Sequence, residues 1–171
     1  MLKKIETELQ DCYIIEPSVF GDDRGYFSPF FIQKDPYCQT KLVEVINGAA
    51  IDVVVDIRKG SPTYGKHIAV LLKPYDSNDK TSGRQLYVPR GFAHGFISLE
   101  DNTIFQYLID NDYAPSMEGG ILWNDPELGI NWSGMFKEYG IDNPLTSEKD
   151  GKHLTLEKVQ IILNIINKKR I

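Results

Sequence analysis

The chain has 171 residues, of which 42% are hydrophobic and 25% charged, and its formal net charge is −5 at pH 7. This length fits a single domain over residues 1–171 whose core needs neither disulfides nor a structural metal, while the negative charge argues against nucleic-acid binding, which needs a concentrated positive face. No apolar run is long enough to span a bilayer and no signal-peptide core follows Met1, so we expect a cytoplasmic protein that does not bind membranes.

Short strands are predicted along most of the chain. The first covers residues 12–17 and ends at Pro17, because proline cannot donate to a β-ladder. The β-branched runs at 42–46 and 50–57 flank Asn47-Gly48, a dipeptide typical of a tight hairpin turn. Further strands are expected at 68–72, 85–88, 95–99 and 104–108, with an exposed hairpin loop at 75–83. Many short strands separated by turn residues predict an all-β sandwich or barrel.

Two carboxylates interrupt the apolar run at 50–57. Strand alternation places Asp52 and Asp56 on one face of this strand and the branched aliphatic residues on the other. A carboxylate on a buried face is costly unless it is paired. That face is therefore either solvated or lines a pocket.

One helix is predicted near the end of the chain. Between residues 156 and 169, apolar side chains recur with helical spacing after Thr155, and the last turn is basic. The two cysteines, Cys12 and Cys38, match neither a disulfide framework nor a metal-ligand spacing. Residues 135–143 carry no functional pattern.

Four short sequence motifs, when they are taken together and in order, are specific enough to indicate a family. They read IEPSVFGDDRGY at 15–26, VVVDIRKGSPTYG at 53–65, VPRGFAHGF at 88–96 and ILWNDP at 121–126. In this order they resemble the dTDP-4-dehydrorhamnose 3,5-epimerase family over residues 5–153. The resemblance implies a cupin-type jelly roll, here with a short C-terminal helix, and a homodimer that needs no metal or organic cofactor. It also implies a dTDP-sugar substrate, a dTDP-4-keto-6-deoxyhexose on the way to dTDP-L-rhamnose or a related sugar.

The chemistry of such a reaction sets the residues it needs. A ketone at C4 acidifies the C–H bonds at C3 and C5, so a base can remove a proton and an acid can return one to the opposite face. A cation or hydrogen-bond donor must stabilise the enolate oxygen.

The resemblance assigns these roles position by position. Tyr107 matches the catalytic acid, Lys41 the lysine near the developing oxyanion, and Asp150 the carboxylate that orients the catalytic histidine. The positions that match substrate contacts, including the aromatic that stacks on thymine, are Arg24, His94, Tyr113, Glu118 and Lys149. Without the resemblance, Tyr107 would be interpreted as a packing residue, Lys41 as a solvated edge charge and the others as loop or surface residues.

The chain departs from the family between Gln33 and Lys34. There the family has roughly thirty more residues, equivalent to about 100 Å of extended chain, including a motif Arg-Gly-Leu-His-[Phe/Tyr]-Gln that supplies the histidine base. The chain has three histidines, and neither His67 nor His153 matches that position. Either the segment is missing from this sequence, or the deletion is real and the sheet is rearranged or completed by a partner.

Three functions are compatible with these features. The first is the 3,5-epimerase; the second is an epimerase at one carbon or a ketoisomerase on the same scaffold. The third is a catalytically degenerate dTDP-sugar-binding or scaffold protein, which the missing histidine motivates. Metal catalysis is weakly supported, because the phrase around His94 resembles one motif of metal-binding cupins but one histidine does not make a site.

Overall fold

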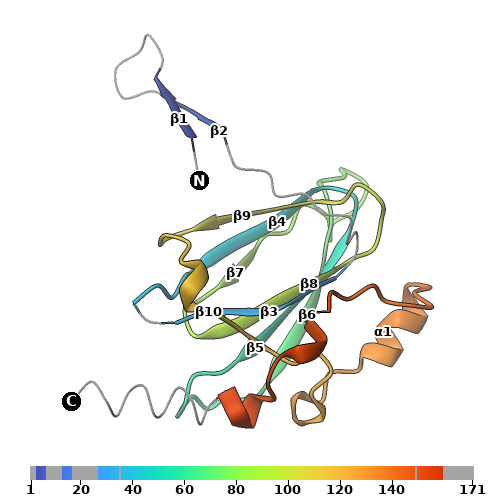
Figure 1. Cartoon of the computed structure of the whole chain (residues 1–171). Helices are drawn as coiled ribbons and strands as arrows, with labels where there is room; N and C mark the ends of the chain where they lie inside the picture. The colour runs from blue at the N-terminus through green and yellow to red at the C-terminus, as the bar shows by residue number, and fades with distance from the viewer. Residues whose placement is uncertain (1–2, 7–12, 17–26, 35, 149, 160–171) are drawn as a thin grey trace.

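Two layered β-sheets form the body of the protein (Figure 1). The structure is a computed structural model, and it describes residues 3–6, 13–16, 27–34, 36–148 and 150–159. The five-stranded sheet has the order β10-β3-β8-β5-β6 and the three-stranded sheet the order β7-β4-β9, while β1 and β2 pair only with each other. The predicted all-β sandwich is therefore confirmed. The strands are β1 (Lys3–Glu6), β2 (Tyr13–Glu16), β3 (Phe27–Gln33), β4 (Lys41–Asn47), β5 (Ala50–Asp56), β6 (His67–Leu72), β7 (Leu86–Val88), β8 (Phe92–Ser98), β9 (Ile104–Ile109) and β10 (Glu118–Ile121).

Strand β5 is buried along its whole length because both of its faces are covered. One face points between the sheets, where Val54 packs with Val43 and Val45 of β4. The other face, which includes Val53, packs with Ile97 of β8 against the C-terminal segments. The stack of Phe96 on Phe105, with ring centroids 3.9 Å apart, joins the two sheets.

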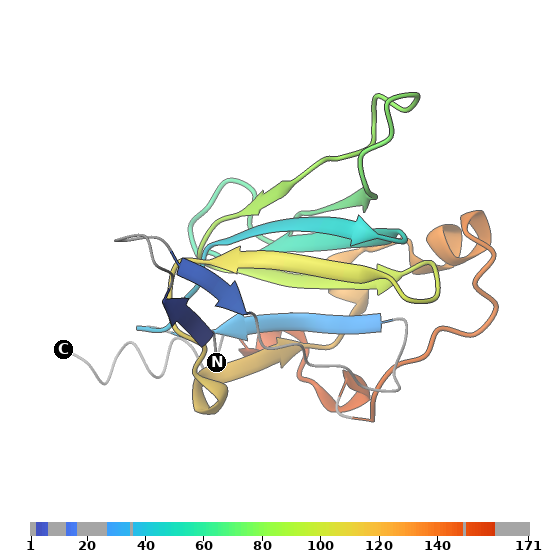
Figure 2. The same cartoon turned by 90° about the horizontal axis from the view of Figure 1, so that it is seen from above.

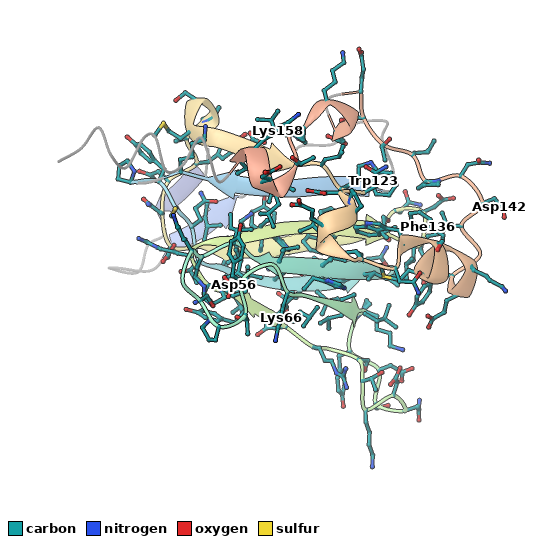
Figure 3. The ribbon with its side chains drawn as sticks, turned by 90° about the horizontal axis from the view of Figure 1, so that it is seen from below. Asp56, Lys66, Trp123, Phe136, Asp142 and Lys158 are labelled. Carbon is teal, nitrogen blue, oxygen red and sulfur yellow. The ribbon has the colours of Figure 1, made fainter. Side chains whose placement is uncertain are left out.

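Short helices and loops after β10 cover the outer face of the five-stranded sheet (Figures 1 and 3). The helices are η2 (Pro126–Leu128), α1 (Trp132–Glu138) and η3 (Asp150–Lys152), whereas η1 (Pro115–Met117) precedes β10. Helix α1, which the sequence analysis did not predict, is capped by Asn131 and contributes Trp132 and Phe136 to an aromatic group with Trp123. Of the predicted terminal helix, residues 156–159 are helical and the rest lie outside the described residues.

The hairpin predicted around Asn47-Gly48 is wrong. Strand β4 pairs with β7 and β9, whereas β5 pairs with β6 and β8, so the chain changes sheets at this turn. Gly48 has φ of 75°, but Asn47 has no positive φ and pairs with Ile104 of β9. A two-residue hairpin turn of the expected type needs positive φ at both positions.

The loop at residues 75–83 also connects the two sheets. It is exposed as predicted, but it joins β6 to β7 and is therefore not a hairpin loop. Figure 2 shows this loop projecting from the sandwich.

Asp56 is buried and paired. Its carboxylate accepts hydrogen bonds from Arg58 Nε at 2.8 Å and Nη2 at 2.7 Å, Ser61 Oγ at 2.6 Å and Thr63 Oγ1 at 2.5 Å. The Arg58 hydrogen bonds hold the pKa of Asp56 well below its usual range, and Ser61 and Thr63 contribute to the same shift. The Arg58 guanidinium also lies 4.4 Å from the centroid of the Phe92 ring. One carboxylate of β5 thus fixes the loop that follows the strand.

We predict that Gly48→Ala destabilises the protein more than Gly60→Ala. Both glycines have positive φ, 75° and 85°, which costs an L-residue roughly 1–2 kcal/mol. A Cβ on Gly48 would lie 2.4 Å from Thr103 Oγ1, whereas a Cβ on Gly60 would meet nothing within 4 Å. Overpacking should add roughly 1–3 kcal/mol at Gly48.

Urea unfolding of the two variants checks this prediction. Equal losses in the free energy of unfolding would mean that Thr103 moves away at no cost and that the close approach at the sheet change is unimportant.

Candidate active site

Polar side chains from both sheets, and one from the segment between β9 and η1, interact with one another. We call this group the polar cluster, and its members are Lys41, Asp52, His94, Tyr107, Tyr113 and Glu118. The strands place them by alternation: Lys41 precedes Val43 and Val45, which are 0% and 3% exposed, on the inner face of β4. On β5, Asp52 likewise precedes the inward-facing Val54.

His94 and Asp52 form a buried pair within the five-stranded sheet. His94 Nε2 lies 2.6 Å from Asp52 Oδ1, and the two residues are 5% and 0% exposed. The Phe105 ring of the opposite sheet lies 6.2 Å from the imidazole, centroid to centroid. Among the described residues, Asp52 Oδ2 has no hydrogen-bond partner. A buried carboxylate with one unsatisfied oxygen lowers the stability of the folded protein. The pair is therefore not explained by core packing alone.

Lys41 and Tyr107 face each other on the three-stranded sheet. Lys41 is opposite Ile109 and Tyr107 is opposite Val43, which makes Lys41 and Tyr107 diagonal neighbours. Lys41 Nζ lies 5.5 Å from the centroid of the Tyr107 ring. Burial lowers the pKa of Lys41, and the charges of Asp52 and Glu118 oppose that shift. The two carboxylates therefore favour the ammonium form that could stabilise an oxyanion.

Glu118 acts on both tyrosines of the cluster. The Tyr113 hydroxyl donates a hydrogen bond to Glu118 Oε2 at 2.7 Å, which raises the pKa of Tyr113 to about 12. Partial burial raises the pKa of Tyr107, and the charge of Glu118 raises it further. Both phenols therefore stay protonated at neutral pH and can donate a proton or a hydrogen bond.

The cluster holds the groups that proton transfer next to a ketone requires. It has an ammonium, a phenol that can serve as an acid, and an imidazole whose ring is fixed by a carboxylate. Within the part of the chain that the structure describes, no group of three histidine, cysteine, aspartate or glutamate side chains could hold a metal.

The structure brings together five of the eight residues that the resemblance singled out. Asp150, in η3, makes none of the contacts that join them: it is 1% exposed, and its Oδ2 accepts a hydrogen bond from Ser147 N at 3.0 Å. Its Oδ1 has no partner among the described residues, so its role stays a prediction. Arg24 and Lys149 lie outside the described residues.

Asp52 is the member that the sequence analysis did not assign to the site. It was expected to be solvated or to line a pocket, and the structure shows it paired with His94. The signal that could have identified it is a carboxylate in a strand that is otherwise apolar on both faces, because a buried carboxylate needs a hydrogen-bond or charge partner.

The family model of dTDP-4-dehydrorhamnose 3,5-epimerase matches residues 30–158 of the chain. The dTDP-4-dehydrorhamnose 3,5-epimerase of Shigella flexneri is 38% identical over 178 positions, which cover 85% of this chain and 91% of the relative. Since 85% of the 171 residues is 145, this chain fills about 145 of the 178 aligned positions. The other 33 or so are gaps in this chain, where only the relative has a residue. The shortfall has the size of the family segment expected between Gln33 and Lys34, although its position stays a prediction.

Solved structures of similar proteins share the fold. The enzyme of Legionella pneumophila in complex with dTDP-4-keto-L-rhamnose has a TM-score of 0.62 and 30% identity, covering 95% of this chain and 97% of that chain. A 3'-monoepimerase of Streptomyces bikiniensis in complex with dTDP-quinovose has a TM-score of 0.67 and 32% identity, covering 81% and 64%. The expected jelly roll is confirmed. No described helix has the length and apolar character needed to cross a membrane.

We predict that Glu118→Gln lowers the pKa of Tyr113 toward its ordinary value near 10, because the carboxylate that stabilises the protonated phenol is lost. In the unchanged protein Tyr113 should still be protonated at pH 11. Titration of ¹³Cζ-labelled tyrosine by NMR measures this, and Tyr113→Phe identifies the signal. A Tyr113 pKa that is the same with and without the carboxylate would contradict the hydrogen bond.

Proposed function

Because the chain belongs to the dTDP-4-dehydrorhamnose 3,5-epimerase family, we propose that it epimerises C3 and C5 of a dTDP-4-keto-6-deoxyhexose in deoxysugar synthesis of the dTDP-L-rhamnose type. The observation that carries this proposal is the pairing of a partly buried ammonium, Lys41, with a protonated phenol, Tyr107. The ligand of the Legionella pneumophila relative, dTDP-4-keto-L-rhamnose, belongs to the same substrate class.

Lys41 and Tyr107 would act on the same enolate. When the C–H bond at C3 or C5 breaks, its proton goes to a base and its electron pair moves to the C4 oxygen. The Lys41 ammonium stabilises that oxygen by charge and by hydrogen bonding. Tyr107 then transfers its hydroxyl proton to the opposite face of the carbon and regains a proton from solvent. Nothing is oxidised or reduced overall, so this chemistry needs no organic cofactor.

The remaining roles follow the family positions. Tyr113 stacks on the thymine, Arg24, His94, Glu118 and Lys149 contact the substrate, and Asp150 occupies the position of the carboxylate that orients the family's catalytic histidine. A phenol that Glu118 already orients presents its ring in a fixed direction, which favours stacking. We also propose that the chain is a single cytoplasmic domain that works as a homodimer.

A second candidate is epimerisation at one carbon only. The likeness to the Streptomyces bikiniensis 3'-monoepimerase favours it, because that protein resembles this chain as well in fold as the 3,5-epimerases do. The third candidate, a non-catalytic dTDP-sugar-binding protein, is motivated by the absence of a histidine at the family's base position.

Incubation of the protein with dTDP-4-keto-6-deoxyglucose in D₂O distinguishes the three candidates. We expect deuterium at both C3 and C5 by NMR and mass spectrometry, since each epimerisation exchanges the carbon-bound proton with solvent. Label at one carbon would support the single-carbon epimerase. Unlabelled sugar together with tight dTDP binding would support the binding protein and refute the epimerase.

We predict that Tyr107→Phe lowers kcat by roughly 10²–10⁴-fold, the usual contribution of a positioned general acid, while dTDP affinity is retained. Tyr87→Phe is the matched control, because Tyr87 lies on β7 and is 63% exposed. Turnover by NMR and dTDP binding by calorimetry measure the two effects. Equal activity of the two variants would remove Tyr107 from the mechanism.

A further inference from the structure

We propose that His94, held by Asp52, is the base that removes the substrate proton in this chain. The proposal rests on the proposed epimerase function and deepens it, because the family's usual histidine has no counterpart here. Of the three histidines in the sequence, His94 is the one that forms a buried hydrogen bond to a carboxylate of the polar cluster.

The hydrogen bond fixes which nitrogen of His94 can accept a proton. When Nε2–H donates to Asp52 Oδ1 over 2.6 Å, the lone pair is on Nδ1. Among the described residues, Asp52 is the only hydrogen-bond partner of the His94 ring, so Nδ1 is not occupied by one of them. The Asp52 charge also stabilises the imidazolium that forms on proton uptake. Asp52 is thus a positioning residue for His94.

The acid and the proposed base come from opposite sheets. Tyr107 lies on β9 of the three-stranded sheet, whereas His94 lies on β8 of the five-stranded sheet. The Phe105 ring is a neighbour of both, with its centroid 6.2 Å from that of His94 and 6.5 Å from that of Tyr107, so the two side chains lie in the same part of the sandwich. A sugar bound between the sheets would have the imidazole on one face and the phenol on the other. Inversion at carbon requires this arrangement.

Lys41 completes the proton and charge balance. The C–H proton passes to His94 Nδ1, the electron pair moves to the C4 oxygen beside Lys41, and Tyr107 protonates the opposite face. His94 then loses its proton to solvent while the tyrosinate regains one. The charge of Asp52 reaches both Lys41 and His94, so a single carboxylate supports the cation and the base.

The test compares four variants for deuterium exchange at C3 and C5, with dTDP affinity and thermal melting measured on each. We expect His94→Gln to lose roughly 10²–10⁴-fold in exchange rate. Asp52→Asn should lose kcat with KM and dTDP affinity unchanged, because an amide that donates to Nε2 moves the ring proton to Nδ1. If Asp52 had only a structural role, Asp52→Asn would change the melting temperature and KM together.

Of the other two histidines, His67 provides the control variant and His153 is the alternative base. His67→Gln should exchange at the wild-type rate, because His67 lies half-exposed on β6. If His153→Gln abolishes exchange and His94→Gln does not, the base is His153 and the proposal is overturned.

The same measurements separate failure of this proposal from failure of the proposed function. Wild-type exchange rates in both His94→Gln and Asp52→Asn would refute the role of His94 while leaving the epimerase intact. No exchange by the wild-type protein would refute the epimerase itself, and the role of His94 with it. If His94→Gln does not fold, the kcat and KM of Asp52→Asn decide.

Discussion

Strand β5 is buried on both faces, yet it carries two carboxylates on the face that points between the sheets. Burying a carboxylate is costly unless hydrogen bonds and opposite charges compensate it. Asp56 is compensated by Arg58, Ser61 and Thr63, and this pairing fixes the loop after the strand. Asp52 is compensated by His94, and its charge also reaches Lys41. The need to pair these two carboxylates therefore sets the position of the imidazole, and the charge of Asp52 opposes the lowering of the Lys41 pKa by burial.

Much of the fold could be predicted from local pattern, because β-branched runs with turn residues between them are a direct signal. The pairing of those strands could not be predicted, because Asn47-Gly48 marks a turn without indicating which strands pair. In the structure Gly48 packs closely on Thr103, and the chain passes from one sheet to the other at this turn. Strand β10 was missed because Glu118-Gly-Gly-Ile121 has little strand propensity and depends on pairing with β3. Helix α1 is short, and its cap at Asn131 was its only strong signal.

The site was predictable only where the resemblance supplied positions. It placed Lys41, Tyr107 and His94 in one site; in the structure Lys41 contacts Tyr107, and the Phe105 ring is a neighbour of both Tyr107 and His94. The resemblance assigned His94 a substrate contact, whereas its hydrogen bond to Asp52 depends on two strands 42 residues apart that only the folded sheet brings together. Asp150 shows the opposite case: its sequence position suggests a partner histidine, but its Oδ1 has none among the described residues.

We propose that substrate binds between the two sheets, with acid and base on opposite faces of the sugar. A crystal structure with dTDP-6-deoxyglucose, which lacks the C4 ketone and cannot react, would show whether it does. We expect the C4 oxygen within hydrogen-bond distance of Lys41 Nζ, Tyr107 on one face of the sugar and His94 Nδ1 on the other. A sugar bound outside the sandwich, or Tyr107 and His94 on the same face of it, would rule out this arrangement of acid and base.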